Sequence, residues 1–418
     1  MVDLVKKERR YLKSLYFVMF LAFGSIQPFA MAFYRQVLTK SDGSPDMLLI
    51  GIIGTVTPIV GFFANLIVGI LSDKFGLSQK LVAILAFMGA ILALSLGICG
   101  TYAAIPNFAP IFIVAVLSYG FVIASLSPLV ESETLQHLNK HSDRKKYGIF
   151  RIWGTYGWAV AALFMGIVLT IAPKIPILGG GENYRLIYYG GAAAMLFLGI
   201  LGIKSKPVTL KKPKISYKHL FKDTLFLRFL IFVFLQGIIL SGAGENYLSF
   251  FWAENLKSPL QIGTVYCLWT IPEIFVMTFS PALLKKFGSR NILLAGILCI
   301  IVEFFLLSML TADMHFMLKL PVALIHGLSF GLHYIGLINY LDRYAHQNMK
   351  ATYFTTMNIA RIVFAAVIGG AVGAIVIDNF GTTMLMRGAA IGMIFMAVLF
   401  VTFVKNPPDE QSAKSLPS

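Results

Sequence analysis

Long apolar segments alternate with short polar ones along the whole chain. A helix needs about 20 apolar residues to cross a bilayer, and twelve segments reach that length. They cover residues 12–35, 46–71, 80–100, 108–131, 147–172, 186–204, 226–252, 260–284, 291–311, 315–341, 351–377 and 385–404. The pattern predicts an all-α membrane protein with twelve transmembrane helices.

Composition favours the same class. Of the 418 residues, 57% are hydrophobic and 13% are charged, and the mean hydropathy is +0.78. A soluble chain with these values would expose too much apolar surface. The net charge of +16 would suggest nucleic-acid binding in a soluble protein. Here the basic residues lie in short loops, so we expect no nucleic-acid partner.

Cysteine usage and the first apolar segment exclude two further features. Cys99, Cys267 and Cys299 all lie in apolar segments without the spacing of metal ligands, so we expect neither a disulfide framework nor a metal site. The first apolar segment is long and lacks a small-residue cleavage site. We therefore expect a retained first transmembrane span rather than a signal peptide.

Lys and Arg are concentrated in alternate loops, for example in residues 6–13, 140–146 and 204–222. The intervening loops hold few basic residues. Under the positive-inside rule the basic loops face the cytoplasm. With an even number of spans, both termini are then cytoplasmic.

The longest loop is basic, contains two prolines and falls near the middle of the chain, which is typical of a linker. We therefore expect two six-helix bundles and their connections, at residues 1–204 (N-terminal bundle), 205–225 (cytoplasmic linker), 226–405 (C-terminal bundle) and 406–418 (cytoplasmic tail).

An internal repeat supports two pseudo-symmetric halves. The dipeptide Ile50-Gly51 recurs as Ile262-Gly263, and the glycine of Lys74-Phe75-Gly76 recurs in Lys286-Phe287-Gly288, with the same offset of 212 residues. Transporter folds built from repeated bundles show such symmetry. Separately, the GxxxG spacing of Gly369 and Gly373 favours close packing of two helices.

The loop after the second span carries the segment Gly-Ile-Leu-Ser-Asp-Lys-Phe-Gly at residues 69–76. It resembles the loop signature of the major facilitator superfamily. The resemblance implies that Gly69 and Gly76 permit a tight cytoplasmic turn, and that Asp73 with Lys74 forms a latch in one transport state. The paired bases that follow in the family are absent here, which departs from the family's detailed latch.

Within that superfamily the chain resembles the branch of the lactose permease (oligosaccharide–proton symporter) and the phenylpropionate permease. The resemblance covers nearly the whole length and is sharpest at residues 128–158, 272–291 and 324–331. It implies a transport function and a binding cavity between the two halves.

Three residues of the first half match the branch position by position. Glu131 ends span four, Arg151 lies in span five, and Trp158 stands two turns later. The resemblance implies that the acid pairs with the arginine and that the indole stacks on a sugar ring, and these groups suit such contacts. Two alternatives stay open, because Glu131 could be solvated at the interface and Arg151 could reach the lipid headgroups.

The second half departs from the branch. Glu273 matches a family acid that binds substrate and serves coupling, and His326 matches a family histidine. Glu303 stands where the lactose permease pattern has an arginine, and Ser329 stands where it has the proton-carrying acid. We hypothesise that the carboxylate has moved between helices and that Glu303 binds the coupled proton with His326. A vestibule-facing or structurally paired Glu303 is the alternative. His333 is expected to be a hydrogen-bonding packing residue.

Other polar residues within spans are functional candidates because charges in a bilayer are costly. Glu245 and Asn246 face a candidate partner, Arg361, and a charge-balancing structural pair is the favoured role. Arg361 lies 210 residues after Arg151, so the cavity can hold an arginine from each half. Gln27 is a further candidate for substrate binding.

These observations predict a secondary active transporter of the cell membrane (inner or plasma). We expect proton-coupled symport of a small polar organic solute, sugar- or glycoside-like, by alternating access. The alternatives are a proton-coupled carrier of nucleosides or of aromatic or organic anions, and a channel or transporter-like sensor. No nucleophile–base pair, metal-spaced set or phosphate-binding loop indicates an enzyme or a primary pump. The expected partners are the solute, the proton and the lipid bilayer, with no cofactor, and the expected state is a monomer.

Overall fold

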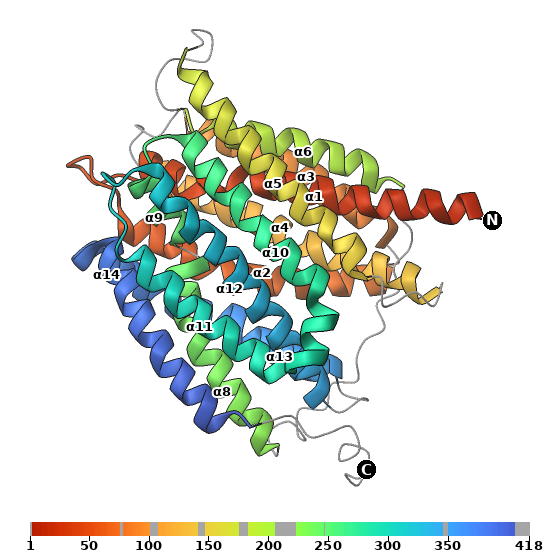
Figure 1. The fold of residues 1–418 in the computed structure, drawn as a ribbon. Helices are drawn as coiled ribbons and strands as arrows, with labels where there is room; N and C mark the ends of the chain where they lie inside the picture. The colour runs from red at the N-terminus through yellow and green to blue at the C-terminus, as the bar shows by residue number, and fades with distance from the viewer. Residues whose placement is uncertain are drawn as a thin grey trace. The chain divides into compact units, whose positions relative to one another are not determined.

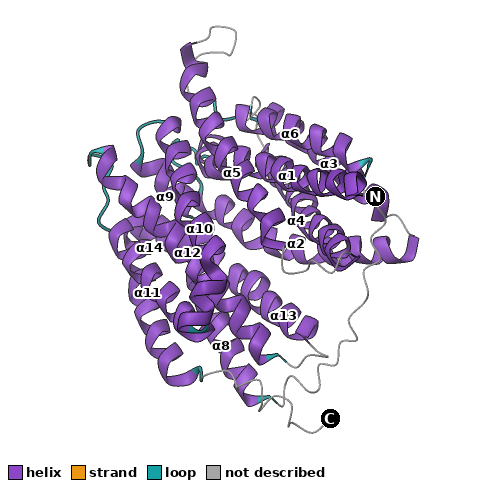
Figure 2. Cartoon of the chain, turned by 45° about the vertical axis from the view of Figure 1, so that its right-hand side comes forward, coloured by secondary structure: helices purple, strands orange, loops and turns teal. Residues whose placement is uncertain are grey.

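The structure, a computed structural model, describes residues 2–75, 78–100, 108–140, 147–174, 183–204, 223–245, 247–345 and 350–405. Helices and short connections make up this part of the chain, and no strand occurs in it (Figure 2). The predicted all-α class is therefore confirmed for these ranges. Most of the predicted linker 205–225 and the whole predicted tail 406–418 lie outside the described residues.

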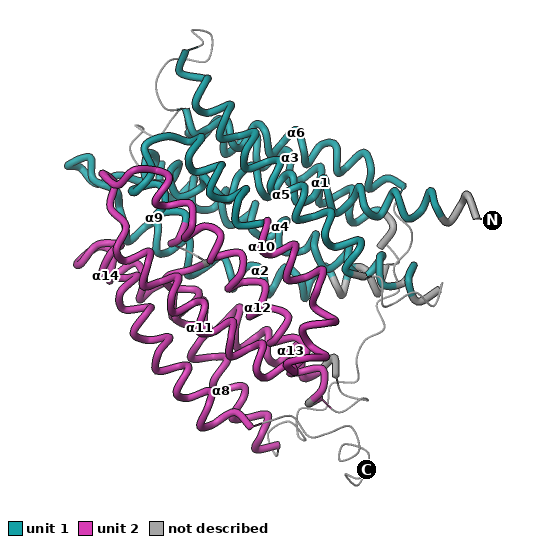
Figure 3. Tube along the Cα trace, in the orientation of Figure 1, with its two compact units in different colours: residues 1–210, 249–270 teal, residues 211–248, 271–418 magenta. Residues whose placement is uncertain are grey.

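The chain forms two compact units, drawn in teal and magenta in Figure 3. Unit 1 comprises Met1–Leu210 with Ser249–Thr270, and unit 2 comprises Lys211–Leu248 with Ile271–Ser418. Residues 249–270 thus group with unit 1 although they follow the predicted linker. The division into bundles at residues 1–204 and 226–405 stays a prediction.

Unit 1 is built from the first six long helices, followed by a short helix and the start of a long one (Figure 1). The elements are α1 (Val2–Val37), α2 (Met47–Phe75), α3 (Ser78–Cys99), α4 (Phe108–Lys140), α5 (Tyr147–Ile171), the 3₁₀ turn η2 (Ala172–Lys174), α6 (Leu186–Gly202), α9 (Leu248–Asn255) and the first part of α10 (Pro259–Phe287). α1 packs along α5 and α6, while α4 packs on α2 and α3. A Cβ at Gly24 would lie 2.7 Å from the carbonyl oxygen of Trp158, so the backbones of α1 and α5 touch there.

Unit 2 contains the remaining elements. They are α8 (Thr224–Ile239), η4 (Leu240–Glu245), the rest of α10, α11 (Ser289–Leu307), α12 (Phe316–Tyr344), α13 (Lys350–Asn358), η6 (Ile359–Phe364) and α14 (Ala365–Phe403). η4 and η6 are π-helical, a conformation that is rare and frequent at functional sites. α11 packs on α12 and α14, and α8 packs on α14.

The predicted close packing at Gly369 and Gly373 is confirmed. A Cβ at Gly369 would lie 2.4 Å from the carbonyl oxygen of Ile238, and one at Gly373 would lie 2.6 Å from that of Gly242. Any larger residue would therefore push α14 away from the α8–η4 segment. The hydroxyl of Tyr247 also donates to the carbonyl of Gly370 at 2.7 Å, which fixes the end of this segment against α14.

Ten helical stretches of the described residues are long and apolar enough to cross a membrane, and α6 is a shorter apolar helix of 17 residues. The last stretch, Thr352–Phe403, has 52 residues. At about 1.5 Å per residue it would exceed twice the ~30 Å hydrocarbon core, but Gly381 interrupts it with a φ of 79°. The number of twelve spans stays a prediction.

Large apolar side chains cover the outer surface of these helices. Ile111 on α4 is 64% exposed, and Phe380 and Phe395 on α14 are 68% and 67% exposed. In water, apolar surface on this scale would drive association. In a bilayer it contacts lipid, while the helices satisfy their own backbone hydrogen bonds.

Candidate functional site

Two glycines bring the backbones of α11 and α12 together in unit 2. A Cβ at Gly296 would lie 2.4 Å from the backbone nitrogen of His333, and one at Gly336 would lie 2.5 Å from that of Leu293. Helices that approach this closely allow short polar side chains to reach one another directly. Such a polar contact joins the two helices at Glu303, seven residues after Gly296 along α11.

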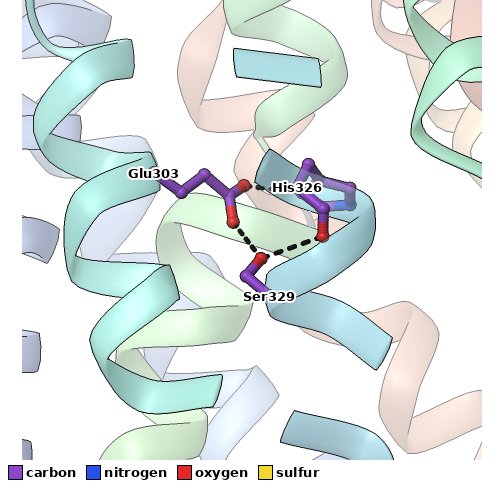
Figure 4. Close-up of polar contacts among 3 residues, drawn as sticks. All are labelled: Glu303, His326 and Ser329. Carbon is purple, nitrogen blue, oxygen red and sulfur yellow. Dashed lines mark hydrogen bonds and ion pairs between the residues drawn. The ribbon is translucent and has the colours of Figure 1, made fainter. Parts of the chain in front are cut away.

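Glu303 on α11 forms a hydrogen-bonded cluster with His326 and Ser329 of α12 (Figure 4). Its Oε1 lies 2.6 Å from His326 Nδ1, and its Oε2 accepts from the Ser329 hydroxyl at 2.5 Å. Ser329 Oγ also lies 2.9 Å from the carbonyl oxygen of His326. A hydroxyl has one proton, so Ser329 can donate either to the carboxylate or to this carbonyl.

The cluster is buried and titratable, which determines what it can do chemically. Glu303 is 4% exposed and Ser329 is 1% exposed. A carboxyl group and an imidazole can each bind and release a proton, and in direct contact one can pass it to the other. Gain or loss of one proton changes the charge of this interior site, and the serine hydroxyl can donate to either form of the acid. The arrangement can therefore bind and release a proton.

The sequence pointed to all three of these residues, and the structure brings them together. The acid of α11 contacts the position of α12 where the branch has its own acid, as a displaced carboxylate would. Glu273 lies half-buried on α10, and its Cα is 3.6 Å from the Cβ position of Gly331. Glu273 therefore contacts α12 at Gly331, which follows Ser329 by two residues. The coupling roles of Glu303, His326 and Glu273 stay predictions.

The predicted partners in span seven are largely outside the described part. Glu245 ends η4, its side chain is not described, and Asn246 lies outside the described residues. Arg361 lies in η6 and is half-buried. The pairing between these positions stays a prediction.

A second buried polar pair in unit 2 was not predicted from the sequence. Gln236 of α8 is fully buried, and its Oε1 accepts a hydrogen bond from His333 Nε2 at 3.0 Å. The sequence predicts a hydrogen-bonding packing role for His333, and this contact shows its hydrogen-bonding partner. Gln236 is the one polar side chain within the stretch 229–240. The rule that polar residues inside spans are functional candidates would have found it.

Arg151 on α5 packs against α1 within unit 1. Its guanidinium carbon lies 4.2 Å from the ring centre of Phe20, a distance typical of a cation–π contact. Its Nη1 lies 2.9 Å from the Cβ position of Gly154, so a side chain at 154 would displace the guanidinium. The absence of a side chain at Gly154 therefore leaves room for the guanidinium of Arg151 against α1.

The other predicted residues of unit 1 are placed less completely. Trp158 is half-buried, and its indole Nε1 is buried without a hydrogen-bond partner among the described residues. Glu131 is half-buried on α4, and Gln27 is exposed on α1. The pairing of Glu131 with Arg151 stays a prediction.

The predicted latch lies at the edge of the described part. Gly69, Asp73 and Lys74 belong to the last turns of α2, but the side chains of Asp73 and Lys74 are not described, and Gly76 lies outside the described residues. Within the described ranges, no group of three or more His, Cys, Asp or Glu could hold a metal ion.

Comparisons with known proteins identify the family. Residues 10–387 match the model of the MFS_1 like family. YegT of Escherichia coli strain K12, which has a provisional name as a nucleoside transporter, is 24% identical over 386 residues and covers 85% of this chain and 86% of its own. The sucrose permease of Escherichia coli is 24% identical over 383 residues, with 88% of each chain covered.

Solved structures share the fold. The nucleoside transporter NupG has a TM-score of 0.73 and 19% identity, covering 98% of this chain and 99% of its own. The inward open xylose transporter XylE from Escherichia coli has a TM-score of 0.74 and 12% identity, covering 99% and 100%. Together with its apolar helices, these similarities establish that the chain belongs to the MFS_1 like family and is a multi-pass membrane transporter of the major facilitator superfamily.

Proposed function

We propose that the protein is a secondary active transporter that couples the movement of a small polar organic solute to that of protons by alternating access. The Glu303–His326–Ser329 cluster is the observation that carries this proposal. A channel or a sensor has no need of a buried group that binds and releases a proton during each cycle. A coupled carrier requires one.

The solute is proposed to be sugar- or glycoside-like. Arg151 offers a rigid fork of donors to hydroxyls or a carboxylate. Trp158 offers an indole face, and its buried N–H has no partner among the described residues. Relatives named for sucrose, maltose and lactose support this class.

Nucleosides are the second candidate class. YegT and NupG are named as nucleoside carriers, and both cover most of the chain. A nucleoside contains a ribose with hydroxyls and a flat ring with acceptor atoms, so the same arginine and indole suit it. The two classes differ in the base, which a sugar lacks.

The twelve-span topology with cytoplasmic termini belongs to the same proposal. Twelve crossings result if α6 crosses the bilayer and if the break at Gly381 separates two crossings. The bias of Lys and Arg toward alternate loops supports cytoplasmic termini. The monomeric state and the latch around Asp73 are proposed with it.

Uptake into proteoliposomes separates the alternatives. The purified full chain should accumulate a labelled solute above its external concentration when an inward proton gradient is imposed, and the accumulation should collapse with a protonophore. The panel is uridine, adenosine, lactose, sucrose and phenylpropionate. Entry that never exceeds the external concentration would favour a channel, and failure to move any member would contradict the proposed solute classes.

A further inference from the structure

A second polar site lies in unit 2, apart from the Glu303 cluster. Gln236 of α8 and His333 of α12 form a pair that is 0% and 5% exposed, respectively. The imidazole Nε2–H donates to the amide Oε1 at 3.0 Å. His333 thereby fixes the orientation of the Gln236 amide, because the amide oxygen is held by the imidazole.

The other end of this amide is incomplete. Gln236 Nε2 carries two N–H donors, is buried, and has no hydrogen-bond partner among the described residues. A buried donor without a partner lowers stability, and most such groups are satisfied in folded proteins. A buried amide that lowers stability in an otherwise apolar part of a helix is a candidate for a functional role.

A second side chain with hydrogen-bond donors, that of Arg361 in η6, lies against the same part of α8. Arg361 packs on the adjacent residue of α8, with its Cγ 3.3 Å from the Cβ position of Gly237. Guanidinium and amide N–H groups donate hydrogen bonds and do not accept them. The chemical group that fits beside them is an acceptor oxygen.

We propose that Gln236 is a solute-binding residue and that His333 is the positioning residue that orients it. The amide N–H group donates to an acceptor oxygen of the solute, a carbonyl, hydroxyl or carboxylate, when the transport cycle opens this part of unit 2. The proposal rests on the proposed transport function. It adds a binding position to α8, in a span where the sequence pointed only to Glu245 and Asn246.

Binding and stability measurements test this with the full chain in lipid nanodiscs. The variants are Gln236→Met and the double variant Gln236→Met/His333→Leu, which removes both partners. Uridine, lactose and phenylpropionate serve as probes for carbonyl, hydroxyl and carboxylate acceptors. For the probe that the wild type binds, the Kd should rise about tenfold or more in both variants, as expected for the loss of a buried hydrogen bond.

The unliganded Tm separates a binding role from a structural one. Replacement of both polar partners by apolar groups of similar size is close to neutral or stabilising, so the double variant should unfold no earlier than the wild type. Ser308→Ala is the matched control. Ser308 is also buried in unit 2, but its hydroxyl donates to the carbonyl of Phe305 in its own helix at 2.7 Å. The control should leave the Kd unchanged.

Two results would overturn the proposal. One is a double variant with the wild-type Kd, and the other is a double variant with a strongly lowered Tm, which would make the pair structural. If the wild type binds no probe, the proposed solute classes are wrong. The role of Gln236 is then tested by whether position 236 is accessible to water. In a chain whose three native cysteines are replaced, a small water-soluble thiol reagent should label Gln236→Cys. A thiol that stays unlabelled under both directions of the proton gradient also contradicts the proposal.

Discussion

Glu303 of α11 and His326 of α12 lie 2.6 Å apart, from Oε1 to Nδ1, with the carboxylate 4% exposed. In the lactose permease pattern the acid at this level belongs to the tenth span, where this chain has Ser329. The serine hydroxyl donates to the carboxylate of Glu303. That Glu303 replaces the family's acid from the neighbouring helix stays a prediction.

An exchange of Glu303 and Ser329 tests whether the position of the acid matters. In Glu303→Ser/Ser329→Glu the carboxylate moves to α12, and the total side-chain volume is unchanged. Because the acid still lies beside His326, uphill uptake should recover to a substantial fraction of the wild-type level, whereas Glu303→Ser alone should lose it. Gradient-driven accumulation in proteoliposomes measures both. Equal loss in the double and single variants would show that the acid is required on α11 itself.

Gly296 and Gly336 set the distance between α11 and α12. Alanine at either position places a Cβ within 2.4–2.5 Å of the backbone of the other helix, so the helices must separate. We expect Gly296→Ala and Gly336→Ala to lower stability by about 1–3 kcal/mol and to impair coupling, since the Glu303 contacts cross the same interface. Thermal unfolding in detergent checks this. Gly388→Ala is the control, because nothing lies within 4 Å of its Cβ position and alanine favours a helix.

Gly381 interrupts α14 with a φ of 79° and a ψ of 170°, a backbone region that is essentially confined to glycine and costs about 1–3 kcal/mol for a residue with a side chain. Gly381→Ala should therefore reduce stability although nothing lies within 4 Å of its Cβ position. Gly381→Asn should lower stability to a similar extent, because the tolerance of Asn for positive φ applies to the left-handed helical region and not to a ψ near 170°. Thermal unfolding should show a lowered Tm for both variants. A stabilised alanine variant would mean that the helix continues through this point.

Arg151 is expected to bind solute through its planar fork. Arg151→Lys keeps the charge but loses the fork and weakens the stacking on Phe20, whose ring centre lies 4.2 Å from the guanidinium carbon. The KM for the transported solute should rise about tenfold or more, as for a lost charge-assisted hydrogen bond. Lys13→Arg is the matched control, because Lys13 Nζ lies over the Trp153 ring at 5.6 Å near the start of α1. An unchanged KM in Arg151→Lys would limit Arg151 to a packing role.

Much of the fold could be predicted from the sequence because bilayer thickness fixes the length of an apolar span. The span expected at 260–284 corresponds to α10, and the one expected at 291–311 overlaps α11. The π-helical turns of η4 and η6 could not be predicted. A π turn is set by local hydrogen bonding and packing, which leave no clear period in an almost wholly apolar segment.

Of the two polar sites of unit 2, one could be predicted from the sequence and the other could not. Glu303, His326 and Ser329 were expected to be related because each aligned with a position of known chemistry in the lactose permease pattern. Gln236 and His333 were not linked, because their contact spans 97 residues of sequence and neither has a charge that demands a partner. Only the folded structure shows that the two side chains meet.

Replacement of Glu303 by glutamine is the most direct test of the proposed coupling. Gln keeps the shape of the side chain and its contacts with His326 and Ser329, but it cannot bind and release the proton. Proteoliposomes with Glu303→Gln should exchange internal for external labelled solute at a rate comparable to the wild type, and should show no accumulation under an inward proton gradient. Normal gradient-driven accumulation in this variant would contradict the account.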